Sequence, residues 1–122
     1  MPFVEAARAQ VAELPKGDRT RIVLEFLLAR AVGQQRAIPW PKIRDFLLRR
    51  GHRLSKNSFQ QGILKQTRES AVFIGSGKRG YYLIADADDA REMRDFYLER
   101  IASERQRLTR LRRLARECGW TI

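Results

Sequence analysis

The sequence contains very little of the chemistry that enzymes and metal sites use. It has one cysteine and one histidine in 122 residues, Cys118 and His52. A lone cysteine excludes an internal disulfide and any metal site built from several cysteines. His52 has no evident Asp or Cys partner, and no other catalytic constellation is present. We therefore expect a protein that is not an enzyme and that holds no metal and no cofactor.

Long hydrophobic runs are also missing. The longest apolar stretches cover only a few residues, whereas a helix that crosses a membrane needs about 20. The first residues, MPFVE, lack the basic region and apolar core of a signal peptide. The sequence therefore predicts a cytoplasmic protein with no membrane partner.

Positive charge is abundant, with a net charge of +11 and a pI near 11.0. Its distribution is uneven, because residues 42–80 hold ten Lys and Arg against two acidic residues and so carry +8 of the total. An arginine-rich composition can simply keep a protein soluble or reflect a GC-rich genome. That alternative does not explain the clustering, so we expect the central segment to face a polyanion.

Hydrophobic periodicity predicts several helices in the first two thirds of the chain. The expected boundaries give an N-terminal helix in residues 1–17, a central domain of residues 18–85 and a C-terminal helix in 86–122. Asp18 and Ser55 are suited to cap the helices that follow them. A short edge strand is expected near Ile38. The predicted helices cover residues 3–14, 19–32, 41–50 and 56–69.

A β-hairpin is predicted after the 56–69 helix. Residues 71–74 and 81–84 are rich in β-branched and aromatic side chains, and the glycine-rich, basic sequence GSGKRG separates them as a flexible loop. Tyr81 and Tyr82 are neighbours in the second strand, so their side chains point to opposite faces. We therefore expect one of these tyrosines to be buried and the other exposed.

The last helix, predicted from about Asp89 to Glu117, is longer than a small domain needs. Apolar residues at a 4/3 spacing form one seam along it, which is typical of a coiled coil. Glu104 is the polar member of this seam. The pattern predicts that this helix packs on a second copy of the chain or on the first helix. We expect homodimerisation, by residues Tyr97, Ile101, Leu108, Leu111 and Ala115.

The order helix, short strand, helix, helix, strand, basic loop, strand over residues 18–84 resembles the winged helix-turn-helix family. The flanking helices look like the dimerisation helices of MarR-like and PadR-like regulators. The resemblance implies a mainly α fold with a small antiparallel β-hairpin wing, an N-terminal helix and a long C-terminal helix.

In that family the second helix of the motif lies in the DNA major groove. By position, the resemblance implies base contacts from the polar residues near the start of this helix, which are Lys56, Asn57, Ser58, Gln60 and Gln61. It implies phosphate contacts from Lys42, Arg53, Lys65 and Arg68. It places Lys78 and Arg79 of the wing on the DNA backbone or in the minor groove.

The sequence therefore favours a basic, sequence-specific protein that binds double-stranded DNA, such as a homodimeric transcription regulator carried by a phage or mobile element. Two alternatives stay open. One is a non-specific DNA-binding module in replication, packaging or genome defence. The other is a winged-helix adaptor that binds proteins through its long helix.

Overall fold

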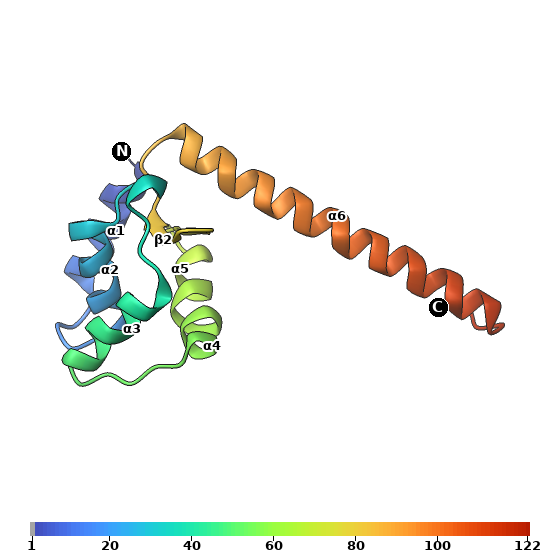
Figure 1. Cartoon of the computed structure of the whole chain (residues 1–122), viewed down its shortest axis with the longest axis horizontal. Coiled ribbons are helices and arrows are strands. Elements are labelled where there is room, and N and C mark those ends of the chain that lie inside the picture. The colour runs from blue at the N-terminus through green and yellow to red at the C-terminus, as the bar shows by residue number, and fades with distance from the viewer. Residues whose placement is uncertain (1) are drawn as a thin grey trace. The chain divides into compact units, whose positions relative to one another are not determined.

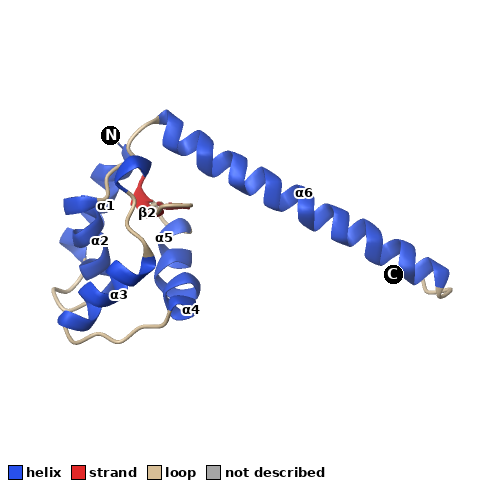
Figure 2. Ribbon diagram, viewed as in Figure 1, coloured by secondary structure: helices blue, strands red, loops and turns tan. Residues whose placement is uncertain are grey.

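The computed structural model describes residues 2–122, which divide into two compact units. The first extends to Ala90 and holds the shorter helices and a hairpin, and the second is Arg91–Ile122, most of which is one long helix (Figure 1). Figure 2 shows helices in nearly all elements and a single pair of short strands. The predicted fold class is confirmed: a mainly helical chain with a two-stranded antiparallel hairpin, an N-terminal helix and a long C-terminal helix.

The first two helices, α1 (Pro2–Glu13) and α2 (Arg19–Arg30), pack against each other. α1 buries Val4 and Ala7, which are three positions apart and so lie on the same face. α2 contributes five buried apolar residues to the core, which are Ile22, Val23, Leu24, Phe26 and Leu27. This packing makes the N-terminal helix part of the first unit.

Asp18 caps α2 as predicted. Its Oδ1 accepts hydrogen bonds from the backbone N–H of Thr20 at 2.8 Å and of Arg21 at 3.2 Å. Two of the four N–H groups that lack a partner at a helix start are thereby satisfied. α2 ends at Arg30, two residues before the predicted end, because Ala31 leaves the helical backbone region with φ of −131° and ψ of +44°.

The segment after α2 contains a 3₁₀ turn that the sequence reasoning missed, η1 (Gln34–Arg36). Gly33 precedes this turn with φ of +93°, a conformation that glycine adopts without a steric penalty. Where a very short edge strand was predicted, Ile38 forms a single antiparallel β-bridge with Tyr81. Its backbone exchanges two hydrogen bonds with Tyr81, both 2.8 Å long.

α3 (Trp40–Arg49) starts within one residue of its predicted position and buries Ile43 and Leu47. Phe46, on the same side, stacks on Phe26 of α2 with ring centroids 4.1 Å apart. This aromatic pair joins α3 to α2.

The next helix runs without interruption from Lys56 to Arg68, and we call it the 56–68 helix. It consists of α4 (Lys56–Ser58), a π-helical segment η2 (Phe59–Leu64) and α5 (Lys65–Arg68). Its extent agrees with the predicted helix, whereas the π-helical segment was not predicted. π-helical turns are rare inside helices and frequently occur at functional sites.

The hairpin pairs β1 (Ile74–Gly77) with β2 (Gly80–Leu83). The prediction of a first strand at residues 71–74 is therefore wrong by three residues. Gly75 lies opposite Tyr82, and a Cβ atom at Gly75 would lie 2.6 Å from the Tyr82 ring. Gly75 therefore belongs to the strand, where the Tyr82 ring leaves no room for a side chain. The turn that connects the two strands is reduced to Lys78 and Arg79.

The prediction that one of the two hairpin tyrosines is exposed is also wrong. Tyr81 is 6% exposed and Tyr82 is 1% exposed. Alternation puts the two rings on opposite faces, but both faces of β2 are covered. The ring of Tyr81 meets Phe59 of the 56–68 helix edge-on at 5.0 Å, and the ring of Tyr82 lies over Gly75.

α6 (Ala87–Glu117) begins with acidic residues, as predicted. Asp86 caps it by accepting the N–H of Asp89 at 2.9 Å, and the buried Asp89 carboxylate accepts the N–H groups of Ala85 at 2.9 Å and Gln34 at 3.3 Å. Most side chains from Arg94 onward are exposed. Among residues 2–122, no helix combines the length and apolar character needed to span a membrane.

Candidate nucleic-acid interface

The inner face of the 56–68 helix fixes the helix in the first unit. Phe59, Ile63 and Leu64 are buried. The ring of Phe59 lies between two other aromatic rings, with centroid distances of 5.0 Å to Trp40 and 5.0 Å to Tyr81. Aromatic pairs at these distances contribute about 0.5–1.5 kcal/mol beyond the area that they bury. The cluster therefore holds the helix against both α3 and the hairpin.

The start of the same helix is polar and open to solvent. The Ser55 hydroxyl accepts the N–H of Ser58 at 3.0 Å, so the predicted cap is confirmed. The predicted base-contacting residues Lys56, Asn57, Ser58 and Gln61 are exposed, as is the predicted phosphate contact Lys65. An α-helix normally buries one face and solvates the other, but here the solvated face carries side chains that match base edges and phosphates.

Gln60 differs from its neighbours in the predicted contact set. It is half-buried, and its Nε2 donates to the Tyr81 hydroxyl at 3.2 Å. The bond connects the 56–68 helix to β2. In this structure Gln60 therefore faces the body of the unit and helps to hold the helix and the hairpin together.

Arg68 likewise bridges two elements. Its Nε donates to the backbone oxygen of Ile74 at 2.9 Å, and its Nη2 donates to the Ser76 hydroxyl at 2.9 Å. Its guanidinium also lies over the Phe73 ring, 5.3 Å from the centroid. The arginine thus fastens β1 to the end of the 56–68 helix. Sequence reasoning assigned Arg68 to phosphate contact, and no local pattern revealed these bonds to residues six and eight positions away.

The hairpin turn presents two cations to solvent. Gly77 pairs with Gly80 at the end of the ladder, which leaves the exposed Lys78 and Arg79 as a two-residue turn. Gly80 has φ of +123°, and a Cβ atom there would lie 2.2 Å from the backbone oxygen of Ile38. Glycine is therefore required at this position for the hairpin to pair with Ile38.

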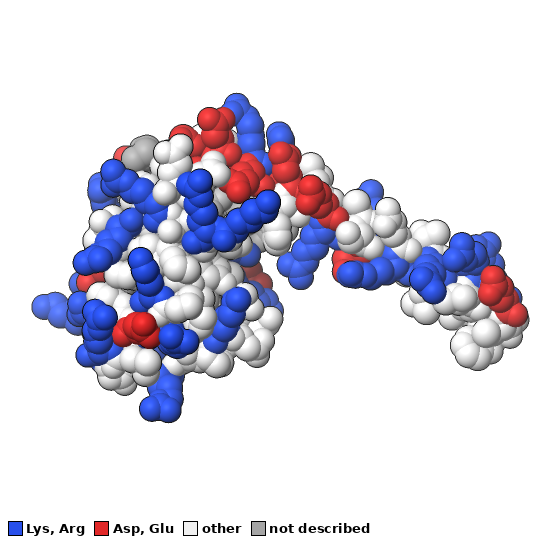
Figure 3. Space-filling view, in the orientation of Figure 1, with Lys and Arg blue, Asp and Glu red and all other residues white. Residues whose placement is uncertain are grey.

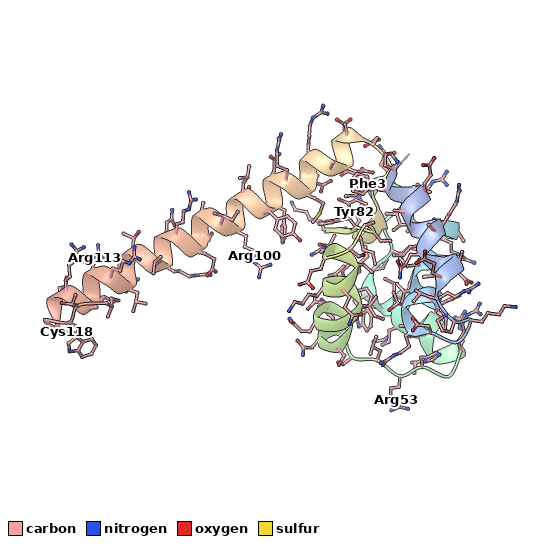
Figure 4. All side chains as sticks on the ribbon, turned by 180° about the vertical axis from the view of Figure 1, so that it is seen from behind. Phe3, Arg53, Tyr82, Arg100, Arg113 and Cys118 are labelled. Carbon is pink, nitrogen blue, oxygen red and sulfur yellow. The ribbon has the colours of Figure 1, made fainter. Side chains whose placement is uncertain are left out.

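A polar groove lies beside the 56–68 helix. It is bounded by the start of α2, the connection before the helix and the side of the helix that carries Ser58 and Gly62. The lining residues are Asp18, Arg19, Thr20, Arg53, Leu54, Ser55, Ser58, Gly62, Ile63 and Gln66. Arg53 extends from the connection away from the helices (Figure 4). Arg19 is a further exposed cation at this groove that sequence reasoning did not select.

The remaining predicted phosphate contact, Lys42, is exposed on α3 and lies on a different element from the others. On the face shown in Figure 3, Lys and Arg side chains are spread over the first unit among uncharged atoms, and many of the Asp and Glu atoms gather near the start of α6. The positive surface is therefore broad. The 56–68 helix and the hairpin turn are the parts that combine cations with a distinctive shape.

The predicted dimerisation residues lie on α6. Ile101, Leu108 and Leu111 are 46%, 45% and 56% exposed, and Tyr97 is half-buried. Ala115 is only 4% exposed. The chain turns back after Glu117, and the Trp120 N–H donates to the Ala115 backbone oxygen at 2.9 Å. The open part of the seam therefore extends from Tyr97 to Leu111.

Comparisons of the chain with family models, with curated proteins and with solved structures find no match. Within residues 2–122, no group of three or more His, Cys, Asp or Glu side chains is arranged to hold a metal ion.

Proposed function

We propose that this protein binds double-stranded DNA by placing the 56–68 helix in the major groove and the Lys78–Arg79 turn on the flanking backbone or in the minor groove. The observation that carries the proposal is the exposed polar start of a helix whose other face is held by the Trp40–Phe59–Tyr81 cluster. A rigidly held helix with solvent-facing amide and ammonium groups can align them with base edges.

The exposed residues divide into two roles. Asn57 and Gln61 have side-chain amides that can donate to and accept from adenine, and Lys56 can donate to guanine acceptors. Their role is to select sequence. The exposed cations bind phosphates and supply affinity without sequence preference, and they are Lys42, Arg53, Lys65, Lys78 and Arg79.

Gln60 and Arg68 have a positioning role in this proposal. Both bind the hairpin from the 56–68 helix, so they fix the distance between the helix and the basic turn. A winged-helix surface depends on that distance, because the helix and the wing contact neighbouring parts of the same duplex.

The protein acts, in this proposal, as a cytoplasmic homodimeric transcription regulator of a phage or mobile element. Two copies joined through Tyr97, Ile101, Leu108 and Leu111 of α6 present two helices to two half-sites. Dimeric DNA-binding proteins of this kind read palindromic sites whose halves lie about one helical turn apart.

The proposal is tested by comparing two sets of variants in duplex-binding assays over a range of salt concentrations. The double variant Lys78→Ala with Arg79→Ala should weaken binding to all sequences. If both side chains neutralise phosphates, the slope of log K against log salt should become less negative by about 2. The matched control removes two exposed cations from outside the interface, by Arg8→Ala with Lys16→Ala, and should change the slope less.

Asn57→Ala and Gln61→Ala should instead change which sequences are preferred, at a cost of about 1–3 kcal/mol on the preferred site. Footprinting of the unaltered protein distinguishes a sequence-specific regulator from the leading alternative, a non-specific DNA-binding module. A single protected site supports the regulator, whereas uniform protection supports a non-specific DNA module. Unchanged affinity and preference in both sets of variants would contradict the proposed docking surface.

A further inference from the structure

Six apolar residues of α6, five of them exposed, are arranged nearly symmetrically about the peptide bond between Glu104 and Arg105. Three pairs lie at nearly equal distances on either side of this point: Ile101 with Leu108, Tyr97 with Leu111, and Phe96 with Leu114. The exposures of the first pair are 46% and 45%, and those of the last are 44% and 44%. Side chains this large are usually buried when they follow a helical repeat.

The charges of α6 are divided at the same point. Residues 87–104 hold six acidic side chains and three arginines, whereas residues 105–117 hold six arginines and one glutamate. The first half therefore carries −3 and the second half +5. Among the charged atoms visible in Figure 3, those on the far half of the helix are mainly Lys and Arg, whereas Asp and Glu appear together with Lys and Arg near its start.

Most arginines of the second half form no ion pair with the residues that the structure describes, 2–122. Arg107 pairs with Glu104 at 2.6 Å. Among the described residues, no carboxylate pairs with the other five, which are Arg105, Arg110, Arg112, Arg113 and Arg116. A helix that leaves a half-exposed apolar stripe beside this many unpaired cations is suited to a partner surface with apolar and acidic groups.

We propose that the occupant of this stripe is the α6 helix of a second copy of the chain, packed antiparallel, with the two-fold axis near Glu104 and Arg105. In that arrangement Ile101 meets Leu108 and Phe96 lies near Leu114, and the members of each of these pairs are almost equally exposed. The half-buried Tyr97 lies near Leu111 of the other helix. Each basic half lies against an acidic half, and Glu99 of one copy lies level with Arg110 of the other.

The parallel alternative is disfavoured by charge. It places +5 beside +5 along the second halves, at a helix separation of about 8–10 Å. That separation is close to the screening length at physiological salt, about 8 Å, so the repulsion is only partly screened. The antiparallel arrangement converts the same charges into attraction, and this difference selects the orientation.

The orientation determines where the first units attach. Equivalent points at the start of the two helices, such as Arg91, lie 27 residues apart along an antiparallel pair, or about 40 Å at 1.5 Å per residue. A parallel pair brings the same points within about 10 Å. The inference rests on the dimer of the proposed function, but it does not require DNA binding.

The test uses the natural Cys118, which is exposed and is the only cysteine. A nitroxide label on Cys118 of the full chain allows the distance between the two copies to be measured by pulsed electron resonance. The antiparallel pair predicts a label separation of about 40 Å, because Cys118 of one copy lies level with Arg91 of the other. A parallel pair predicts about 20 Å or less and ready formation of a Cys118 disulfide between copies.

A second label site near the proposed axis serves as the internal control. Ser103→Cys in a Cys118→Ser background should give a separation of about 20 Å or less in the antiparallel pair, since position 103 lies about 5 Å along the axis from its counterpart. A long Cys118 separation together with a short Ser103→Cys separation supports the proposal. Two short separations overturn it.

A monomer in light scattering also overturns the inference, and this outcome would point to a different occupant of the stripe, such as an acidic helix of another protein. Duplex binding is measured on the same labelled samples. Loss of DNA binding with the two expected separations would contradict the proposed function and support the helix pairing, so the two failures are distinguishable.

Discussion

Gly80 offers the sharpest test of how the wing is built. Its φ of +123° is one that L side chains rarely adopt, and a Cβ atom would lie 2.2 Å from the backbone oxygen of Ile38 and 2.6 Å from the nitrogen of Pro39. Both nearby atoms belong to backbone, so they cannot move aside by a change of rotamer. Gly80→Ala must therefore distort the hairpin or separate it from Ile38.

The stability lost in the Gly80→Ala variant has two contributions. Placing a residue with a Cβ atom in an unfavourable backbone region costs about 1–2 kcal/mol. Separation of the strands breaks the two 2.8 Å hydrogen bonds between Ile38 and Tyr81, each worth about 0.5–1.5 kcal/mol. The expected loss is about 3 kcal/mol, which lowers the melting temperature by at least about 10 °C for a unit of this size.

Gly62→Ala is the matched control, since it makes the same chemical change elsewhere in the first unit. Gly62 lies in the 56–68 helix, and a Cβ atom there would meet nothing within 4 Å apart from its chain neighbours and the adjacent helix backbone. Alanine should therefore stabilise the unit, by up to about 1 kcal/mol. Thermal denaturation followed by circular dichroism measures both variants. Equal shifts, or a neutral Gly80→Ala variant, would refute this description of the hairpin.

Three further predictions address the interface and its supports. Arg68→Met keeps the apolar stem but removes the bonds to Ile74 and Ser76, and it should destabilise the first unit by about 1.5–3 kcal/mol in chemical denaturation; an unchanged midpoint would show that the arginine does not fasten the hairpin. Asp18→Ala should cost about 1 kcal/mol through loss of the α2 cap, whereas Asp18→Asn should cost much less, and equal losses would contradict the capping role. Leu108→Arg should convert dimer to monomer in light scattering while the melting temperature of the first unit stays the same; a dimer that survives would show that this residue lies outside the contact.

The parts of the fold that sequence reasoning predicted are those set by neighbouring residues. Helical periodicity located α1, α2, α3 and the 56–68 helix, because their apolar faces repeat at the spacing of one turn. Asp18 and Ser55 were identified as caps because a cap bonds only to residues two or three positions away. Local patterns were sufficient for these elements.

The errors arose where distant segments decide the structure. Gly75 and Gly80 read as loop residues in the sequence, but one lies under the Tyr82 ring and the other against the Ile38 backbone. Both tyrosines are buried because β2 has neighbours on both faces. Alternation along a strand determines which way a side chain points, but it does not reveal what covers that side.

The candidate interface shows the same limit. The exposed polar residues at the start of the 56–68 helix were selected from the sequence because the apolar spacing of the helix leaves them outside. Gln60 and Arg68 were placed in the same set, but each binds the hairpin. Their partners lie six to 21 positions away in the chain, and no periodic pattern connects residues at such separations.

Affinity for duplex DNA as a function of salt concentration tests the central claim most directly. Fluorescence anisotropy with a labelled duplex gives the slope of log K against log salt. If the five exposed cations assigned to phosphates all make contact, the slope should be about −4 to −5 for each bound protomer. A slope near zero, or no duplex binding at about 50 mM salt where phosphate contacts are strong, would contradict the account.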